Sequence, residues 1–407
     1  LGYRTTMDPG RRAGALATEE HARDARKIAE ESIVLMKNEK NVLRIDKGGS
    51  SRIVVVGENA VKMVAIGGGS WSRKVAYEVS PLEGIRNRAG DTAEVVYVKG
   101  YESPAVREQD VKGAKAPEKK PIDAEGLRAE AVKAAGKADA VIFVGGLNKN
   151  PNQDCEGDDR LSYGLPYGQD ELIAELIAAN PNTVVLIVSG NAVEMPWAKA
   201  APAIAQVWYG GSEAGNAIAS VVFGDVDPSG KLPFTFPVRL GDNGAHALCD
   251  SPVNGGDVVY REEILVGYRW HDTKKIKPQF AFGHGLSYTS FGYGKVTADK
   301  KTMTGAEAII VSVPVTNTGS RGGYEIVQCY VSDLKSSLPR PAKELKAFDK
   351  VWLEPGETKT VKFTLGRDAL SFFDDTRNEW VAEPGKFEIL VGASSADIKS
   401  KVSFELK

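Results

Sequence analysis

The sequence predicts an α/β sandwich, built on a mostly parallel and doubly wound sheet, followed by an antiparallel β-sandwich. Between residues 52 and 237, short β-branched runs alternate with helical segments, which is typical of a parallel sheet covered on both faces. From about residue 293, apolar and polar residues alternate with a period of two between turn clusters, which is typical of an antiparallel sandwich. A chain of 407 residues with 42% hydrophobic residues can bury the cores of two or three domains.

The first of these domains supplies strands and helices in alternation. We expect strands at residues 53–56, 95–98, 141–144, 184–188 and 204–209, and helices at residues 18–37, 82–88, 124–135, 169–179, 195–200 and 213–222. Right-handed crossovers between the strands then make the sheet doubly wound. Several strand ends run into glycine and small polar residues, at 57–59, 145–148, 189–191 and 210–212. These segments would line the rim at the carboxyl ends of the strands, where such sheets bind ligands.

The change of period divides the chain into four parts. Residues 1–50 form a lead-in with a helix, 51–239 the α/β sandwich domain, 240–294 a connector, and 295–407 the β-sandwich. In the β-sandwich we expect strands at 309–315, 325–332, 358–365 and 386–391, separated by turn clusters at 317–320, 354–357 and 383–385. The connector is rich in aromatic residues, so we expect it to be packed rather than disordered.

The composition excludes several classes of partner and cofactor. The net charge is −2 and the signs are mixed along the chain, so no nucleic acid and no membrane is expected as a partner. Three distant cysteines and four histidines form no disulfide framework and no metal-ligand spacing. The glycine-rich loops lack the GxGxxG and GxxxxGK[ST] motifs. We therefore expect no metal and no cofactor.

The polar segment 148–172, which follows the strand expected at 141–144, is the candidate for chemistry. No GxSxG nucleophile elbow is present, which leaves carboxylate chemistry with one carboxyl held protonated and another ionised. Glu156 is the best single candidate, because Gly157 beside it permits a close backbone approach. Arg160 could pair with Asp158 or Asp159 and so hold the loop. On pattern alone, a solvated loop without chemistry is favoured over an active site as the interpretation of these carboxylates.

Motifs along nearly the whole chain resemble those of glycoside hydrolase family 3. The segment from Glu156 to Arg160, with Leu165, Pro166 and Gln169, resembles the EGxDR…LPxxQ signature of that family. Further similar strings lie at 31–38 (ESIVLMKN), 67–70 (GGGS), 81–84 (PLEG), 224–233 (GDVDPSGKLP), 266–270 (VGYRW) and 282–288 (FGHGLSY). The strings at 343–348 (KELKAF) and 353–357 (LEPGE) resemble the fibronectin-III-like tail of the family.

The resemblance implies a retaining exo-acting β-glycosidase, most often a β-glucosidase, that acts on an oligosaccharide or β-glycoside without a cofactor. In that family a TIM-like barrel precedes the sandwich and supplies the nucleophilic aspartate and most sugar contacts. By motif position Glu156 is the general acid/base and Asp158, Asp159 and Arg160 support its loop. Trp71 would stack on the sugar at the aglycone side, although a buried tryptophan is the equal alternative. Exported family members favour a periplasmic or secreted location.

The chain departs from the family pattern in one respect. It begins at Leu1, where the barrel of the family would just have ended, and it has no barrel-length run of strands and helices. We therefore expect a part of a longer polypeptide that is inactive without its barrel. The alternatives are a non-catalytic carbohydrate-binding or assembly module, or a β-xylosidase of the same family, and a homo-oligomer remains open.

Overall fold

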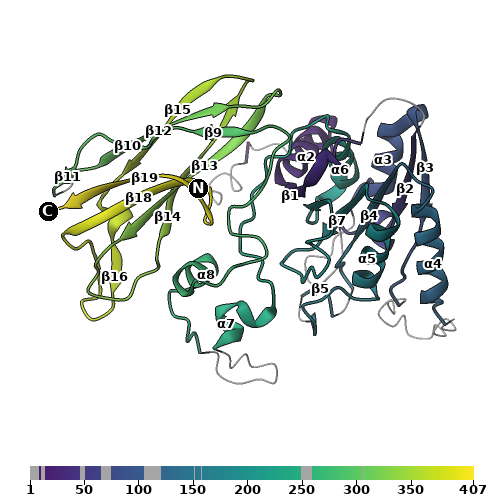
Figure 1. The fold of residues 1–407 in the computed structure, drawn as a ribbon, viewed down its shortest axis with the longest axis horizontal. Helices are drawn as coiled ribbons and strands as arrows, with labels where there is room; N and C mark the ends of the chain where they lie inside the picture. Colours follow the sequence, from purple (N-terminus) through teal and green to yellow (C-terminus); the bar gives the residue numbers. More distant parts are fainter. Residues whose placement is uncertain are drawn as a thin grey trace.

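The structure, a computed structural model, describes residues 9–10, 14–45, 51–65, 75–104, 121–150, 152–156, 158–248, 259–305 and 307–407, without the side chains of Asp158 and Asp159. The α/β sandwich and the β-sandwich lie side by side, and the connector runs between them (Figure 1). This arrangement confirms the predicted fold class. Among the described residues, no helix is both long enough and apolar enough to cross a bilayer.

A six-stranded sheet in the order β1-β8-β7-β4-β2-β3 forms the centre of the first domain. Its strands are β1 (Val34–Asn38), β2 (Ser51–Val56), β3 (Ala93–Val98), β4 (Ala140–Gly146), β7 (Thr183–Val188) and β8 (Ala203–Gln206). All neighbouring pairs are parallel except β1 with β8, which are antiparallel. The sheet is therefore mostly parallel, as predicted, with one reversed edge strand.

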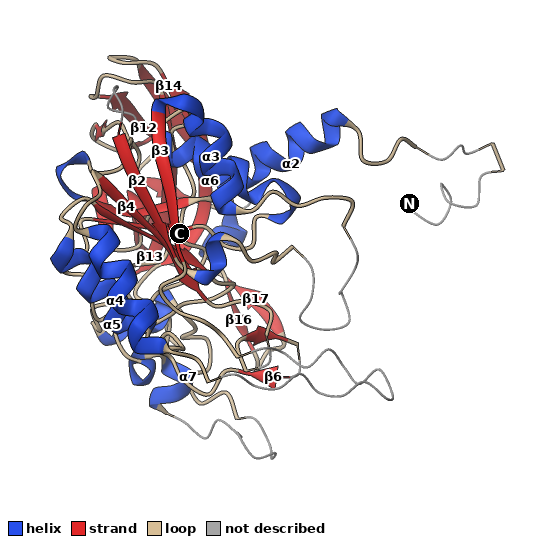
Figure 2. Ribbon diagram, turned by 90° about the vertical axis from the view of Figure 1, so that its right-hand side faces the viewer, coloured by secondary structure: helices blue, strands red, loops and turns tan. Residues whose placement is uncertain are grey.

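Helices cover both faces of this sheet because its strands are apolar on both sides (Figure 2). On β2, Ile53 and Val55 join one core while Val54 and Val56 join the other. The helices on the first face are α2 (Glu19–Ser32), α3 (Pro81–Ala89) and α6 (Ala214–Phe223), and those on the second face are α4 (Ala124–Ala135) and α5 (Gln169–Ala179). Short 3-10 turns lie at η1 (Glu39–Asn41), η2 (Glu58–Ala60), η3 (Gly90–Thr92) and η4 (Gly211–Glu213).

Three predicted elements of this domain are wrong at their ends or in kind. The helix expected at 18–37 ends at Ser32, and Val34–Asn38 is a strand whose pairing with β8 overrides the helical spacing. The helix expected at 195–200 is a series of turns, in which the Ala201 amide bonds the Trp197 carbonyl at 3.0 Å and Pro202, which has no amide hydrogen, cannot continue a helix. The strand expected at 204–209 stops at Gln206, and Trp208 has a φ of 56°.

Two sheets pack face to face in the second domain. The strands of one are β9 (Phe291–Tyr293), β10 (Thr297–Ala298), β12 (Ile309–Asn317) and β15 (Thr358–Leu365). Those of the other are β11 (Thr302–Met303), β13 (Gly323–Asp333), β14 (Glu344–Leu353), β18 (Gly385–Ser394) and β19 (Asp397–Leu406). A small hairpin of β16 (Phe372–Asp374) and β17 (Glu379–Val381) follows the turn η6 (Arg367–Leu370). The four strands predicted here are present, whereas β14 and β19 were not predicted.

Partly buried polar contacts stabilise the joint between the two domains. Asp227, which follows α6, accepts hydrogen bonds from Ser287 Oγ at 2.9 and 2.8 Å and from the Tyr288 amide at 2.7 Å. His284 Nε2 donates to the Met36 carbonyl of β1 at 2.8 Å. Gly283 has a φ of 77°, and a Cβ there would lie 2.1 Å from Gln328 Oε1. The strings at 224–233 and 282–288 therefore build this joint.

The connector carries η5 (Leu240–Asp242), α7 (Gly244–Ala247) and α8 (Tyr268–Lys274). Most of its aromatic residues pack, as expected, whereas Tyr260 is 71% exposed. Trp270 is buried, and the ring of Tyr268 stacks on Phe282 with centroids 4.6 Å apart. The Tyr268 hydroxyl also accepts a 2.8 Å hydrogen bond from the Leu345 amide of β14, which attaches the connector to the β-sandwich.

Candidate active site

The candidate site lies on the rim formed by the carboxyl ends of the parallel strands. The chain leaves β2 for β3 on one side and later returns to β4 on the other side, so the order of strands reverses between β2 and β4. Such a reversal separates the two following loops and opens a crevice that commonly binds ligands. The loops after β2 and β4 meet here, since Asn59 Nδ2 donates a buried 2.9 Å hydrogen bond to the Leu147 carbonyl.

A polar cluster stabilises this switch point. Glu58 accepts hydrogen bonds from the amide of Ser103 at 3.1 Å and from its hydroxyl at 2.9 Å. Lys62 Nζ lies 3.2 Å from Asn150 Oδ1 and 3.4 Å from Ser103 Oγ. Burial lowers the pKa of Lys62, and the charge of Glu58 opposes that shift. The start of the candidate loop is therefore held against the loops that follow β2 and β3.

Amide side chains hold the rest of the loop in shape. Gln153 Oε1 accepts a 2.9 Å hydrogen bond from the Asn148 amide, and its Nε2 donates to Tyr167 Oη at 2.8 Å. Gln169, fully buried at the start of α5, accepts from the Gly146 amide at 2.7 Å and donates to the Gly146 carbonyl at 2.9 Å. Gln169, the glutamine of the LPxxQ string, therefore satisfies the backbone hydrogen-bonding groups of the last residue of β4.

A short hairpin carries Glu156 at its turn. Its strands are β5 (Asp154–Cys155) and β6 (Asp158–Asp159), with Asp154 paired to Asp159 and Cys155 to Asp158. Glu156 occupies the turn and its side chain is exposed. Gly157, to which we gave a role in backbone approach, lies outside the described residues. An exposed carboxyl on a two-residue turn can reach a molecule bound over the rim.

Asp154 anchors the root of this hairpin. Its Oδ2 accepts hydrogen bonds from the Gly190 amide at 2.6 Å and from Tyr209 Oη at 2.8 Å, and its Oδ1 accepts from Asn191 Nδ2 at 2.9 Å. These donors lie in the loops after β7 and β8. We assigned no role to Asp154 from its sequence context, because its partners are 36 to 55 residues away along the chain. Only its place two residues before Glu156 hinted at one.

Lys149 and Tyr209 interact electrostatically with Asp154 and with each other. Lys149 Nζ lies 3.7 Å from the centroid of the Tyr209 ring, within the range of a cation–π contact. Burial lowers the pKa of Lys149, and the charge of Asp154 opposes the shift. Burial and then the charge of Asp154 raise the pKa of Tyr209, so its hydroxyl stays a donor. A cation, a phenol and a carboxylate thus stabilise one another beneath the hairpin.

Arg160 leaves the hairpin and attaches it to the loop after β7. Its Nη2 donates a 2.5 Å hydrogen bond to the Ala192 carbonyl, and its guanidinium carbon lies 5.7 Å from the centroid of the Tyr163 ring. It also lines a cavity of about 430 Å³ that extends to α7 and α8. The predicted pairing with Asp158 or Asp159 rests on side chains outside the described part of the chain. Trp71 also lies outside the described residues.

Two carboxyl groups of the hairpin, Asp154 and Glu156, lie in different surroundings. Among the residues that the structure describes, no three His, Cys, Asp or Glu side chains converge to hold a metal ion. Cys155, next to Glu156, is a free thiol. Glu156 is the exposed carboxyl of the hairpin, whereas Asp154 is committed to three hydrogen bonds. The two carboxyl groups therefore have different roles, one as support and one facing solvent.

The family follows from comparison with known proteins. Residues 33–288 match the model of the glycosyl hydrolase family 3 C-terminal domain, and residues 325–395 match that of a fibronectin type III-like domain. The first match covers more than half of the chain, which therefore belongs to glycoside hydrolase family 3. The resemblance seen in the sequence motifs is confirmed.

Two curated relatives that match nearly the whole chain are named β-glucosidases. The chain is 50% identical to a β-glucosidase of Bacteroides ovatus, over 100% of this chain and 54% of that protein. It is 41% identical to thermostable β-glucosidase B of Acetivibrio thermocellus, over 94% of this chain and 48% of that protein. The crystal structure of β-glucosidase from Kluyveromyces marxianus in complex with glucose superimposes with a TM-score of 0.86 at 30% identity, covering 98% of this chain and 64% of that one. The chain thus spans about half the length of the curated relatives.

Proposed function

We propose that this chain is the C-terminal part of a retaining exo-β-glycosidase, a β-glucosidase in the first instance, and that it supplies the general acid/base Glu156. The observation that carries the proposal is the exposed Glu156 on a hairpin turn whose root Asp154 holds with three hydrogen bonds. A rigid support and an accessible carboxyl are what a proton donor to a glycosidic oxygen requires. The names of the relatives supply the substrate class.

In the proposed reaction Glu156 acts twice. Its carboxyl first gives a proton to the glycosidic oxygen while a carboxylate nucleophile attacks the anomeric carbon and forms a glycosyl-enzyme. The Glu156 carboxylate then takes a proton from the water that cleaves this ester and releases the sugar. The retaining route requires the two carboxyl groups to lie about 5–5.5 Å apart. The nucleophile would belong to an N-terminal TIM-like barrel, which adds about 250 residues.

The test uses the natural polypeptide that carries this chain. Its intact mass should exceed that of the chain by the mass of a TIM-like barrel of about 250 residues. Glu156→Ala should lower its kcat for cellobiose by about 100-fold or more. With an aryl β-glucoside that has a good leaving group, the kcat of Glu156→Ala should fall less than with cellobiose. Added azide should restore the turnover of this variant and yield a β-glucosyl azide. An aryl β-xyloside assayed in parallel separates a β-xylosidase from a β-glucosidase.

Glu130→Ala is the matched control, because Glu130 is an exposed carboxylate on α4, away from the rim. It should keep the turnover of the wild type. Unchanged hydrolysis of cellobiose by Glu156→Ala would overturn the acid/base assignment. A natural polypeptide no longer than this chain would instead favour a non-catalytic module.

A further inference from the structure

A second cavity lies in the β-sandwich, away from the hairpin of Glu156. It measures about 810 Å³ and opens between the loop after β13, the turn η6 and the β16–β17 hairpin with the residues after it. Figure 1 draws β16 at the lower end of the β-sandwich, whereas β5 lies on the α/β domain beyond the connector. The cavity is therefore a separate site on a separate domain.

An exposed indole forms one wall of this cavity. Trp380 of β17 lines it and is 72% exposed. Across the hairpin Phe373 pairs with Trp380, and the two rings meet edge to face with centroids 5.8 Å apart and an interplanar angle of 68°. Phe373 thus contacts the indole while most of the Trp380 surface stays open. A flat aromatic face beside polar groups is suited to stack on the C–H face of a pyranose ring.

The polar wall of the cavity has mixed charge. Lys335, Arg367 and Arg377 supply cations, and Glu379 and Glu383 supply carboxylates. Carboxylates would repel a phosphate or sulfate, whereas hydroxyl groups can accept from the cations and donate to the carboxylates at once. This mixture therefore favours a neutral, hydroxyl-rich ligand over an anion.

One polar atom of the wall lacks a partner. Ser336 Oγ is buried and makes no hydrogen bond to any residue that the structure describes. Buried hydroxyls are usually hydrogen-bonded, because an unsatisfied one costs free energy. Its neighbour Ser337 is fully engaged, since its amide donates to Glu383 at 2.8 Å and its hydroxyl also donates to that carboxylate. Because this oxygen has almost no surface that a water-sized molecule can reach, a ligand in the cavity does not contact it, and the polar contacts come from the charged side chains of the wall.

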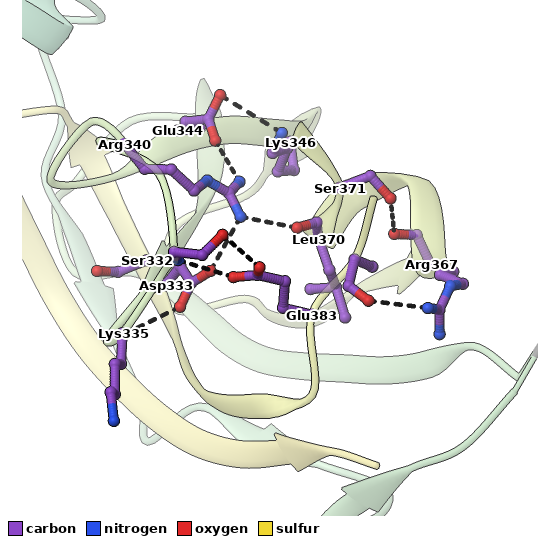
Figure 3. A network of polar contacts seen from close by, with 12 residues as sticks. Ser332, Asp333, Lys335, Arg340, Glu344, Lys346, Arg367, Leu370, Ser371 and Glu383 are labelled. Carbon is purple, nitrogen blue, oxygen red and sulfur yellow. Dashed lines mark hydrogen bonds and ion pairs between the residues drawn. The ribbon is translucent and has the colours of Figure 1, made fainter. Parts of the chain in front are cut away.

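A buried ion network preforms the cavity (Figure 3). Arg340 is bonded to Asp333 at 3.2 Å, to Glu344 at 2.6 Å and to the Leu370 carbonyl of η6 at 2.8 Å. The residues between Asp333 and Arg340 include the cavity loop, so its two ends are fixed to one another and to η6. Preformed sites lose little ordering entropy when a ligand binds.

We propose that this cavity binds a neutral oligosaccharide, with one pyranose ring stacked on Trp380 and its hydroxyls bonded to Arg377 and Glu379. The site holds a sugar chain without cleaving it. It is independent of Glu156 and of the proposed acid/base chemistry.

The experiment measures binding to this chain by isothermal titration calorimetry. The probes are cellotetraose, xylotetraose and mannotetraose, with inorganic phosphate as the anionic comparison. At least one tetrasaccharide should bind, and Trp380→Ala should weaken it by about tenfold. Glu379→Gln should weaken it as well, whereas Glu156→Ala should leave binding unchanged.

Trp352→Ala is the matched control. Trp352 of β14 is 37% exposed, packs edge to face on Tyr324 and donates to Glu354 at 2.8 Å, but it does not line the cavity. Its removal should leave sugar binding intact. No heat from any of the three tetrasaccharides, equal binding by Trp380→Ala, or displacement of the sugar by phosphate would each overturn the proposal. Circular dichroism of each variant confirms that it is folded.

Discussion

The phenol of Tyr209 donates a 2.8 Å hydrogen bond to Asp154 Oδ2 and so ties the loop after β8 to the root of the hairpin that carries Glu156. Because Asp154 is otherwise bonded to Gly190 and Asn191, the hairpin depends on the loops after two different strands. Asp154 takes no part in the proposed chemistry, but it positions Glu156 by attaching the hairpin to the loops that follow β7 and β8.

Asp154→Asn should loosen the hairpin without unfolding the domain. All three donors face the two oxygens of Asp154, so either orientation of an asparagine amide sets one N–H group against a donor. We expect faster hydrogen exchange at the amides of β5 and β6. In the natural polypeptide we expect a fall in kcat of about 100-fold, as a small misplacement of a catalytic group can cause.

Tyr209→Phe should loosen the hairpin less than Asp154→Asn does, because it removes one of the three donors and leaves the carboxylate in place. Its kcat should lie between those of Asp154→Asn and the wild type. Full turnover by Asp154→Asn, with unchanged exchange in β5 and β6, would contradict a positioning role for Asp154.

Local signals in the sequence predicted much of the α/β domain. The bounds of α4 agree with the prediction, since Asp123 caps its first turn through a 2.9 Å hydrogen bond to the Gly126 amide and Gly136 follows its last turn. The edge strand β1 could not be predicted in this way. Its residues have helical spacing, and only their pairing with β8, some 170 residues later, makes them a strand.

The same distinction applies to the candidate site. Glu156 could be singled out by its motif, because the string around it is contiguous. Asp154 could not, because its three donors lie on other loops and come together only in the fold. The Trp380 cavity also depends on segments brought together by the β-sandwich, from the loop after β13 to the β16–β17 hairpin.

Asp227→Ala should destabilise the joint between the domains. The change leaves the Ser287 hydroxyl and the Tyr288 amide without their acceptor in a partly buried place. Unsatisfied buried donors cost about 1–3 kcal/mol, so we expect a loss of that size in the free energy of unfolding, measured with urea. Asp225→Ala, two residues earlier, removes only a partly exposed ion pair with Arg88 and should cost less than about 1 kcal/mol. Equal losses in the two variants would argue against a structural role for Asp227.

The joint should weaken as the pH falls below about 6.5. Burial lowers the pKa of His284 from 6.5, while its hydrogen bond to the Met36 carbonyl opposes the shift. The unfolded chain therefore takes up a proton at a higher pH than the folded chain does. The stability that neutral His284 contributes is complete above pH 6.5 and is lost as the pH falls toward the lower pKa of the folded state.

Urea unfolding of the wild type at pH 7.5 and at about pH 5.5 measures this loss. His284→Gln keeps a donor for Met36 but does not titrate, so its stability should change less between the two conditions. His246→Gln removes an exposed imidazole on α7 and should retain the pH dependence of the wild type. Equal pH dependence in His284→Gln and the wild type would show that His284 does not cause it.

Arg340→Met should destabilise the β-sandwich more than the loss of any surface ion pair. Arg340 is 5% exposed, and the side chains of its partners Asp333 and Glu344 are 3% and 13% exposed. Removal of Arg340 leaves the buried carboxylate of Asp333 without its cation, at about 3–5 kcal/mol, while Glu344 keeps ion pairs with Lys346 and Arg269. Lys401→Met, which breaks the exposed pair with Glu388, is the control and should cost less than about 1 kcal/mol. Thermal unfolding of the three proteins compares them.

The same network predicts how the stability depends on acid. Burial opposes the ionisation of Glu344, but the hydrogen bond from Arg340 and the charges of Lys346, Arg340 and Arg269 outweigh it and lower its pKa below 4.5. The folded state therefore holds Glu344 ionised at a pH where the unfolded chain is protonated. Its contribution is present above pH 4.5 and is lost as the pH falls through the lower folded value. In Arg340→Met this acid-dependent loss should shrink, because the main donor to Glu344 is gone. An equally steep loss of stability below pH 4.5 in Arg340→Met and the wild type would contradict the assignment to this network.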